Sequence, residues 1–373
     1  MRGENLRGYR RWGGGAPRRC GAPAIVAALV LLAAGVAAPV SETAPGEREF
    51  VCFVYHRFGD DRYPSTNISL EALRGQLEFL RRERYTVLTL GDAVGRLQAG
   101  TLPQRTAVLT VDDGYASLAT AGLPILDEFQ VPITLFVNSR SVGGKGMLSW
   151  KELADLAARG MEIGNHTASH DYFLNLPTQK RLERFKADIK EAQEKLAANL
   201  GVEPRVFSYP FGEYDLQMKE AVEELGFQCA VAQNSGVVHQ GSDLYALPRF
   251  PMGGPYATVA GFSSKARMKA LRVLEREPRT PLLEGSGQAS LQLLVDSRGI
   301  RHSGMQCFVA GRRACDLEVT QETEGAAHTF RVTVKSREEL TARRTLCTVT
   351  APSVDGSAWH WFSHVWVRPE IPE

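Results

Sequence analysis

The chain has 373 residues, of which 43% are hydrophobic and 23% are charged, and its formal net charge is +2. This composition argues against disorder on a large scale and is sufficient for one large domain and a smaller one. The first 40 residues contain six of the arginines, so the rest of the chain is near neutral and has no concentrated basic segment. Charge therefore gives no support for nucleic-acid binding.

Residues 1–40 have the pattern of an export segment. The six arginines precede an uncharged run at 21–40, whose most apolar part, 24–38, has the length of a secretory hydrophobic region. Small residues at 35–38 offer a cleavage site. The run also approaches the roughly 20 residues that span a bilayer, so an uncleaved membrane anchor is the alternative. In both cases we expect an exported protein of the periplasm or cell envelope.

Short apolar runs alternate with helical patterns from residue 45 to about 275. Strands are expected at 50–55, 106–111, 133–138, 161–166, 205–210 and 229–233, and helices at 69–83, 118–129, 150–160 and 182–201. The last of these helices ends at a C-cap glycine, Gly201. Repeated strand–helix units predict an α/β fold, with a barrel of parallel strands and a site at their C-terminal ends.

The C-terminal part has a different pattern. Residues 276–287 are rich in proline, glycine and charge and predict a linker. Alternating runs at 290–296, 328–336, 345–352 and 359–368 then predict a small all-β, sandwich-like domain over 288–373. Trp359, Trp361 and Trp366 in the last run offer aromatic faces for a sugar, although packing in a core is the favoured interpretation.

The chain has six cysteines, at positions 20, 52, 229, 307, 315 and 347, and no CxxC metal pattern. An oxidising compartment permits disulfides. We expect a bridge between Cys307 and Cys347, because each lies in a strand-like apolar run.

Two adjacent carboxylates, Asp112 and Asp113, directly follow an apolar strand and precede Gly114. Two like charges side by side are costly away from water unless a cation or hydrogen bonds compensate. A metal bound by one of the acids is one explanation for the pair. A solvated turn is the alternative, because Asp and Gly are common turn residues.

His166 and His170 follow another predicted strand. Two imidazoles at this spacing can point at one ion if the chain turns helically between them, although an accidental pair is the alternative. Together with one of the acids they make a three-ligand set that leaves positions open for water and substrate. This arrangement is typical of a catalytic metal site and leaves the second carboxylate for proton transfer.

Three segments carry a family resemblance. TVDDG at 110–114, HTASH at 166–170 and YPFG at 209–212 resemble, in this order, the three main motifs of the polysaccharide deacetylase, or NodB-homology, family of carbohydrate esterases. The resemblance covers about residues 50–255, and VYHRF at 54–58 gives it the look of the poly-N-acetylglucosamine deacetylase branch. It implies a deformed (β/α) barrel that hydrolyses N-acetyl groups of an amino-sugar polysaccharide.

The resemblance also implies one divalent metal. Its ligands would be Asp113, His166 and His170, with Asp112 as the general base. Zn²⁺ is expected from its availability, and Co²⁺, Ni²⁺ and Mn²⁺ are alternatives that the same ligands accept.

The third motif would contribute the substrate contacts. The resemblance implies that the backbone N–H of Phe211 donates to the oxyanion and that Tyr209, Pro210 and Phe211 line the substrate site. Many members of the family have an arginine where this chain has Ser208. Arg249 is a candidate to replace that positive charge, and a surface arginine is the alternative interpretation.

The leaving amine needs a proton donor, and two histidines compete for this role. His56 follows the first predicted strand, as the acid histidine of the poly-N-acetylglucosamine deacetylases does. His239 resembles the other, C-terminal acid motif of the family. An imidazole suits this role near neutral pH.

The expected substrate is a poly-N-acetylglucosamine-like glycan, ahead of chitin-like polymers and peptidoglycan. Two other functions stay open. One is a catalytically silent glycan-binding protein of the envelope, which the intact set of acids and histidines argues against. The other is a deacylase of a small or lipid-linked sugar, which the same motifs permit.

Overall fold

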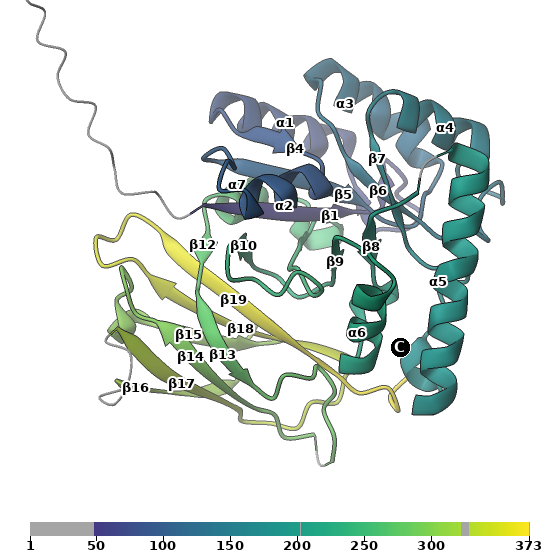
Figure 1. Ribbon diagram of the computed structural model, residues 1–373. Coiled ribbons are helices and arrows are strands. Elements are labelled where there is room, and N and C mark those ends of the chain that lie inside the picture. Colours follow the sequence, from purple (N-terminus) through teal and green to yellow (C-terminus); the bar gives the residue numbers. More distant parts are fainter. Residues whose placement is uncertain (1–47, 202, 286, 322–327, 373) are drawn as a thin grey trace, which may run out of the picture. The chain divides into compact units, whose positions relative to one another are not determined.

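The computed structural model describes residues 48–373, except 202, 286, 322–327 and 373 (Figure 1). The expected export segment at 1–40 lies outside the described residues, so both of its interpretations stay predictions. Within the part that is described, no helix has the length and apolar character needed to cross a membrane.

One nine-stranded sheet organises the N-terminal region. Its order is β10-β1-β5-β6-β7-β8-β9, with β4 beside β5 and β11 beside β1. Only β10 is antiparallel to its neighbour. The sheet curls into a half-barrel, which confirms the expected deformed barrel. Its strands are β1 (Glu49–Tyr55), β4 (Thr86–Leu88), β5 (Thr106–Val111), β6 (Thr134–Val137), β7 (Glu162–Asn165), β8 (Val206–Ser208), β9 (Cys229–Val231), β10 (Val237–His239) and β11 (Phe250–Pro251).

Helices connect these strands (Figure 1). They are α1 (Leu70–Arg82), α2 (Leu90–Gln98), α3 (Leu123–Phe129), α4 (Trp150–Ala158), α5 (Thr178–Leu200), α6 (Leu216–Glu224) and α7 (Val259–Ala266). A π-helical turn, Leu118–Gly122, precedes α3, and a separate pair is formed by β2 (Arg57–Phe58) and β3 (Asn67–Ile68). Short 3₁₀ turns occupy Phe173–Asn175, Pro210–Gly212, Gly254–Tyr256 and His302–Gly304.

Local sequence signals set several helix ends. The Ser69 side chain accepts a hydrogen bond from the N–H of the third residue of α1, and Ser149 with Glu152 forms a capping box at α4. Gly201 ends α5 with φ +65°, which confirms the expected glycine C-cap. The helix begins at Thr178, earlier than its apolar spacing indicated.

Two four-stranded sheets form the C-terminal region, as expected for an all-β architecture. Their orders are β12-β19-β18-β15 and β13-β14-β17-β16. Apolar side chains from both sheets meet in one buried cluster, which includes Leu293, Val332, Val349 and Trp366. The strands are β12 (Lys269–Ala270), β13 (Val273–Glu277), β14 (Ser290–Asp296), β15 (Gln306–Val309), β16 (Cys315–Gln321), β17 (Thr329–Ser336), β18 (Arg344–Pro352) and β19 (Trp359–Val367).

The C-terminal sheets begin before the expected linker at 276–287. Strand β12 pairs with β19, and β13 pairs with β14, so Lys269 already belongs to these sheets. Leu282, inside the expected linker, forms a β-bridge with Val367. Composition indicates a local preference for turns, but it does not show that a segment pairs with a strand about ninety residues later. The predicted linker therefore placed the start of the C-terminal β region too late.

The expected Cys307–Cys347 disulfide is wrong. Cys307 bonds Cys315, with a Cα–Cα distance of 6.2 Å, and Cys347 is a free, buried thiol. In the pairing of β15 with β18, Cys307 stands opposite Val349 rather than opposite Cys347. The chain returns through a short turn to Cys315 at the start of β16, and this return brings the two bonded sulfurs together.

The three tryptophans of β19 have different environments. Trp366 is 3% exposed and lies in the core of the two sheets. Trp361 is partly buried, and its indole N–H donates to the Ser235 hydroxyl at 2.9 Å. Core packing is confirmed for Trp366, while Trp359 is 39% exposed.

Buried His364 predicts a pH dependence of stability. It is 2% exposed, and within the described residues its Nε2 has no hydrogen-bond partner. Burial, aided by nearby Arg276, lowers the pKa of His364 to about 3. The unfolded chain, with a histidine pKa of about 6.5, therefore binds more protons between these values, and stability falls as the pH drops.

We expect the free energy of unfolding to fall by on the order of 2 kcal/mol through His364 between pH 7 and pH 5. Urea unfolding at both pH values measures it, with His364→Gln as the control that cannot titrate. An equal loss of stability in that variant would show that other groups cause the effect.

Candidate active site

The predicted chemical groups follow the C-terminal ends of neighbouring strands. Asp112 comes directly after β5, His166 after β7 and the 209–212 turn after β8. The pairings of Val111 with Leu135 and of Val137 with Asn165 keep these strand ends in register. Because the strands are parallel, residues that are distant in sequence meet at one edge of the sheet.

Asp113, His166 and His170 form the three-ligand cluster that the sequence predicted. Oδ1 of Asp113 lies 3.4 Å from Nε2 of each histidine. The ligand atoms of all three residues lie within 4.8 Å of one another. One oxygen and two imidazole nitrogens at this separation suit a divalent ion such as Zn²⁺, with room left for other ligands.

Two further observations fit a metal in this cluster. Asp113 Oδ1 is buried, and the described residues offer it no hydrogen-bond partner, so an acceptor is left without compensation. His166 Nδ1 lies 2.7 Å from the Ser208 carbonyl, to which it donates, so its Nε2 is free to act as a ligand. This backbone contact fixes the orientation of the ring.

The histidine segment is not helical between its two imidazoles. Thr167 and His170 have φ values of +63° and +57°, so the chain does not turn helically between the two imidazoles. The rings nevertheless meet, with centroids 4.7 Å apart. The loop, rather than a helix, brings them together.

Asp188 on α5 holds this loop in place. None of the motifs in the sequence indicated this role for Asp188. Its buried carboxylate accepts hydrogen bonds from the N–H groups of Ala168 and Ser169, at 2.9 and 2.8 Å. The N–H of Thr167, in the same loop, donates a hydrogen bond to Oδ1 of Asn165. The available signal in the sequence was an acid among the apolar positions of an otherwise amphipathic helix.

Arg249 is buried beside Asp112 and is not a surface arginine. Two parallel hydrogen bonds join its guanidinium to the Asp112 carboxylate, at 2.7 and 2.8 Å, and both side chains are fully buried. The same guanidinium donates to Thr110 and to Ser208, the residue that replaces the usual arginine of the third motif. The replacement expected from the sequence is therefore present in the structure.

The charges around the acids keep both of them ionised near neutral pH. Burial alone would raise the pKa of Asp112, but Arg249 holds it below its usual value. Burial also opposes ionisation of Asp113, yet the neighbouring His166 and His56 lower its pKa. Burial and the neighbouring His166 lower the pKa of His170 to about 4, so this imidazole is neutral and able to bind a metal.

Strand register separates the two acid candidates. His56 follows Tyr55, the last residue of β1, whose carbonyl accepts a hydrogen bond from the N–H of Asp112. His239 pairs with Glu49, at the opposite end of the same strand. Tyr55 lies six positions after Glu49 along the strand, which is about 20 Å. Only His56 is close to the acids, consistent with its influence on their pKa values.

The third motif contributes one exposed ring and two packed ones. Phe211 has φ +58° and is partly exposed beside His170, with ring centroids 4.4 Å apart. Tyr209 is fully buried in an apolar cluster, and its hydroxyl donates to the Tyr245 carbonyl at 3.0 Å. Pro210 is buried as well. Packing therefore buries the side chains of Tyr209 and Pro210, and Phe211 is the residue of the three whose side chain is partly exposed.

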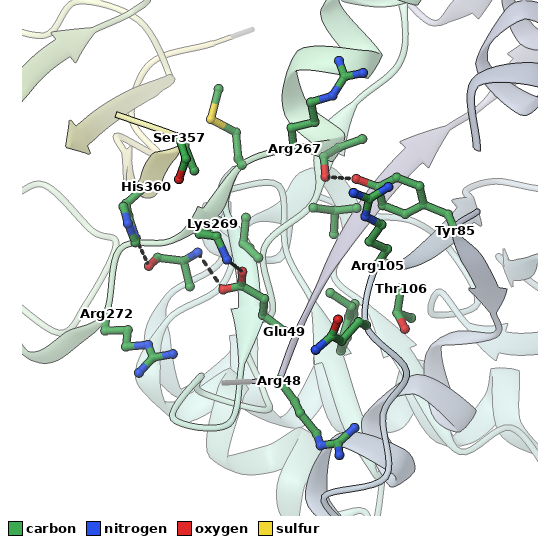
Figure 2. Close-up of a pocket in the computed structure, with 18 of the residues that line it drawn as sticks. Arg48, Glu49, Tyr85, Arg105, Thr106, Arg267, Lys269, Arg272, Ser357 and His360 are labelled. Carbon is green, nitrogen blue, oxygen red and sulfur yellow. Dashed lines mark hydrogen bonds and ion pairs between the residues drawn. The ribbon is translucent and has the colours of Figure 1, made fainter. Parts of the chain in front are cut away.

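A cavity of about 510 Å³ lies at the other end of β1 (Figure 2). Figure 2 shows Arg48, Glu49, Lys269, Arg272 and His360 around it. None of the predicted site residues is among those that line it. Arginines and lysines outnumber carboxylates in its wall, and some of these charges pair there, as Lys269 does with Glu49 at 3.5 Å. The candidate chemistry is therefore at the strand ends and not in this cavity.

Comparison with known families gives one match at the strand-end site. Residues 99–230 match a family model described as polysaccharide deacetylase. This range contains both acids, both histidines and the 209–212 turn, whereas His56, Arg249 and the C-terminal sheets lie outside it.

Several of the curated relatives are named poly-beta-1,6-N-acetyl-D-glucosamine N-deacetylase, among them proteins from Escherichia coli and Staphylococcus epidermidis. The protein from Escherichia coli (strain K12) is 26% identical over 244 residues, which are 54% of this chain and 36% of the relative. The protein from Staphylococcus epidermidis is 21% identical over 201 residues, which are 51% of this chain and 70% of the relative. This chain thus spans about a third of the length of the first relative.

Two solved structures share the fold. The structure of IcaB from Ammonifex degensii has a TM-score of 0.52 and 26% identity, and the match covers 59% of this chain and 97% of that one. The Streptococcus pyogenes deacetylase PplD, in complex with acetate, has a TM-score of 0.53 and 18% identity, with 58% and 96% covered. The second likeness concerns the fold alone.

Proposed function

We propose that this chain, which contains a polysaccharide deacetylase domain, hydrolyses N-acetyl groups of a poly-N-acetylglucosamine-like polysaccharide with the help of one divalent metal ion. The observation that supports this most directly is the cluster of Asp113, His166 and His170 beside a second buried carboxylate, Asp112. A site of this kind combines ligands for a metal with a separate proton acceptor.

A divalent ion held by Asp113, His166 and His170 would supply Lewis-acid polarisation of the acetamide carbonyl. Different residues of the chain then accept and donate the protons. Asp112, ionised and oriented by Arg249, accepts a proton from the water that attacks the carbonyl carbon. Attack produces a tetrahedral carbon with a negative oxygen, and the N–H of Phe211 donates a hydrogen bond to it.

The carbon–nitrogen bond breaks when the leaving nitrogen receives a proton. We assign this step to His56, because it lies at the same strand ends as the acids whereas His239 does not. The products are acetate and a free amine on the sugar. The amine is cationic near neutral pH, so the reaction converts a neutral polymer into a positively charged one.

The names of the relatives favour a poly-N-acetylglucosamine-like glycan over chitin-like polymers and peptidoglycan. We also propose that the protein is exported and acts in the periplasm or cell envelope, where such a polymer is accessible. Both points rest on likeness to the relatives and on the pattern of residues 1–40.

Metal dependence and substrate class are tested together. The full chain is treated with a chelator, and acetate release is measured from β-1,6- and β-1,4-linked N-acetylglucosamine oligomers of increasing length. We expect chelation to remove at least about 99% of the activity, because no other group in the site supplies Lewis-acid polarisation. Addition of Zn²⁺, Co²⁺, Ni²⁺ or Mn²⁺ should restore it.

Three results would count against the proposal. Acetate release that survives chelation would contradict metal dependence, and a faster rate on a monosaccharide than on oligomers would favour a small-sugar deacylase. Binding of glycan without acetate release from any oligomer would identify a catalytically silent binding protein.

A further inference from the structure

A buried ion pair connects the third motif to the C-terminal sheets. Glu213 directly follows the 209–212 turn and is 3% exposed. Arg343, which immediately precedes β18, is 5% exposed and donates to both Glu213 oxygens, at 2.7 and 2.8 Å. Truncating one partner of such a pair leaves the other charge buried and unpaired, and this destabilises the folded protein.

The rest of the Arg343 guanidinium is also used. It donates to the Asn175 side chain at 2.9 Å and to the carbonyls of Pro369 and Ile371, at 2.9 and 3.1 Å. Arg344, the first residue of β18, adds a hydrogen bond to Glu213 at 2.8 Å. Two consecutive arginines of the C-terminal region thus hold one carboxylate of the α/β region.

The same arginine reaches the metal cluster through aromatic rings. The Arg343 guanidinium lies 4.5 Å from the centroid of the Tyr172 ring. Tyr172 stacks on Phe211, with centroids 3.7 Å apart and planes 5° apart. Phe211 in turn contacts the ring of His170, a residue of the proposed metal cluster. Two rings, those of Tyr172 and Phe211, therefore lie in contact between Arg343 and His170.

The turn that Glu213 follows has a backbone that needs support. Phe211 has φ +58°, a left-handed conformation that is strained for a residue with a Cβ. Gly212 has φ +70°, and a Cβ there would lie 2.5 Å from the Gln233 side chain. A conformation of this kind persists only where its surroundings fix it. The Glu213 carboxylate, anchored from the other region, provides such fixation directly beside it.

We propose that Arg343 is a positioning residue for the deacetylation site: by pairing with Glu213 it holds the turn at Phe211 in the conformation that presents its backbone N–H to the oxyanion. This inference rests on the proposed function. It makes the C-terminal β region a part of the catalytic unit, rather than a separate glycan-binding module.

The test uses full-length variants and acetate release from N-acetylglucosamine oligomers. We expect Arg343→Met to lower kcat about 10- to 100-fold with less than a threefold change in KM, because an oxyanion donor acts in the transition state. Arg343→Lys keeps the charge but not the bidentate geometry, so its kcat should lie between those of Arg343→Met and the wild type. Glu213→Gln should resemble Arg343→Met.

The double variant Glu213→Gln/Arg343→Met should lower kcat no further than either single change, because both remove the same interaction. Ser363→Ala is the matched control for loosening of the contact between the two regions. Its buried hydroxyl accepts a hydrogen bond from the Ser235 N–H at 2.7 Å, away from the third motif. We expect a lower Tm and a kcat within twofold of the wild type. Zinc stoichiometry is measured for every variant.

Each outcome decides between explanations. A wild-type protein that releases no acetate would reject the proposed function itself, whatever the variants do. An active wild type with unchanged kcat in Arg343→Met would overturn the positioning role. So would additive losses in the double variant, or an equal loss of kcat in Ser363→Ala at matched Tm. If Arg343→Met does not fold, Arg343→Lys and Glu213→Gln decide the question by the same criteria.

Discussion

Replacing Asp112 with asparagine is expected to lower kcat for acetate release by about two to four powers of ten, while metal binding is retained. The asparagine has nearly the same shape but cannot accept the proton of the attacking water. Arg249 would then have a neutral partner in place of the carboxylate that it pairs with at 2.7 and 2.8 Å. The measurement is steady-state kinetics on zinc-loaded protein with the metal content determined in parallel.

Asp113→Asn is the matched comparison, because it changes the neighbouring acid by the same few atoms. Asp113 lies 3.4 Å from both imidazoles, so we expect this variant to lose metal affinity together with activity. Unchanged turnover in Asp112→Asn would reject its role as the base. Loss of metal in Asp112→Asn, with metal retained in Asp113→Asn, would show that the two roles are reversed.

Replacing Arg249 with methionine is expected to reduce both stability and activity. The guanidinium is fully buried and is the main positive group that compensates the buried Asp112 carboxylate. Removing one partner of a buried pair costs about 3–5 kcal/mol, because the other charge is left without a partner. Activity should fall as well, because Arg249 is the group that, among the described residues, hydrogen-bonds both oxygens of Asp112.

Urea unfolding and kinetics separate these two effects. Arg249→Lys should recover little, because an ammonium cannot form the two parallel hydrogen bonds of the guanidinium. The double variant Asp112→Asn/Arg249→Met should be more stable than Arg249→Met alone, because it no longer buries an unpaired carboxylate. Equal stability of the single and double variants would show that the ion pair is not the source of the loss.

Residues whose position depends on short-range structure could be predicted from local patterns. The alternation of apolar runs and helical patterns was enough to recognise two strands. One of them is followed by Asp112 and Asp113, and the other by His166. Because parallel strands place their C-terminal ends at one edge, the strand order had only to bring these segments near each other. The family resemblance then supplied the role of each residue.

Contacts between distant segments could not be predicted in this way and depend on how the chain folds. Arg249 is 137 residues from Asp112, and Arg343 is 130 residues from Glu213, so no local pattern reveals either pair. The partner of Cys307 likewise depended on which residue of β18 stands opposite it, and strand register is invisible in a single apolar run. The burial of Tyr209 followed from packing between elements rather than from its motif.

The division has one physical reason. Backbone preference and apolar periodicity act over a few residues, and they fix where strands end and therefore where the acids and the first histidine lie. Compensation of a buried charge acts through space, and its partner comes from whichever segment the fold brings within hydrogen-bond distance. The motifs thus predicted the base and the metal ligands and offered Arg249 as a candidate partner of Asp112. The Arg249–Asp112 contact itself and the Arg343–Glu213 pair were established by the folded chain.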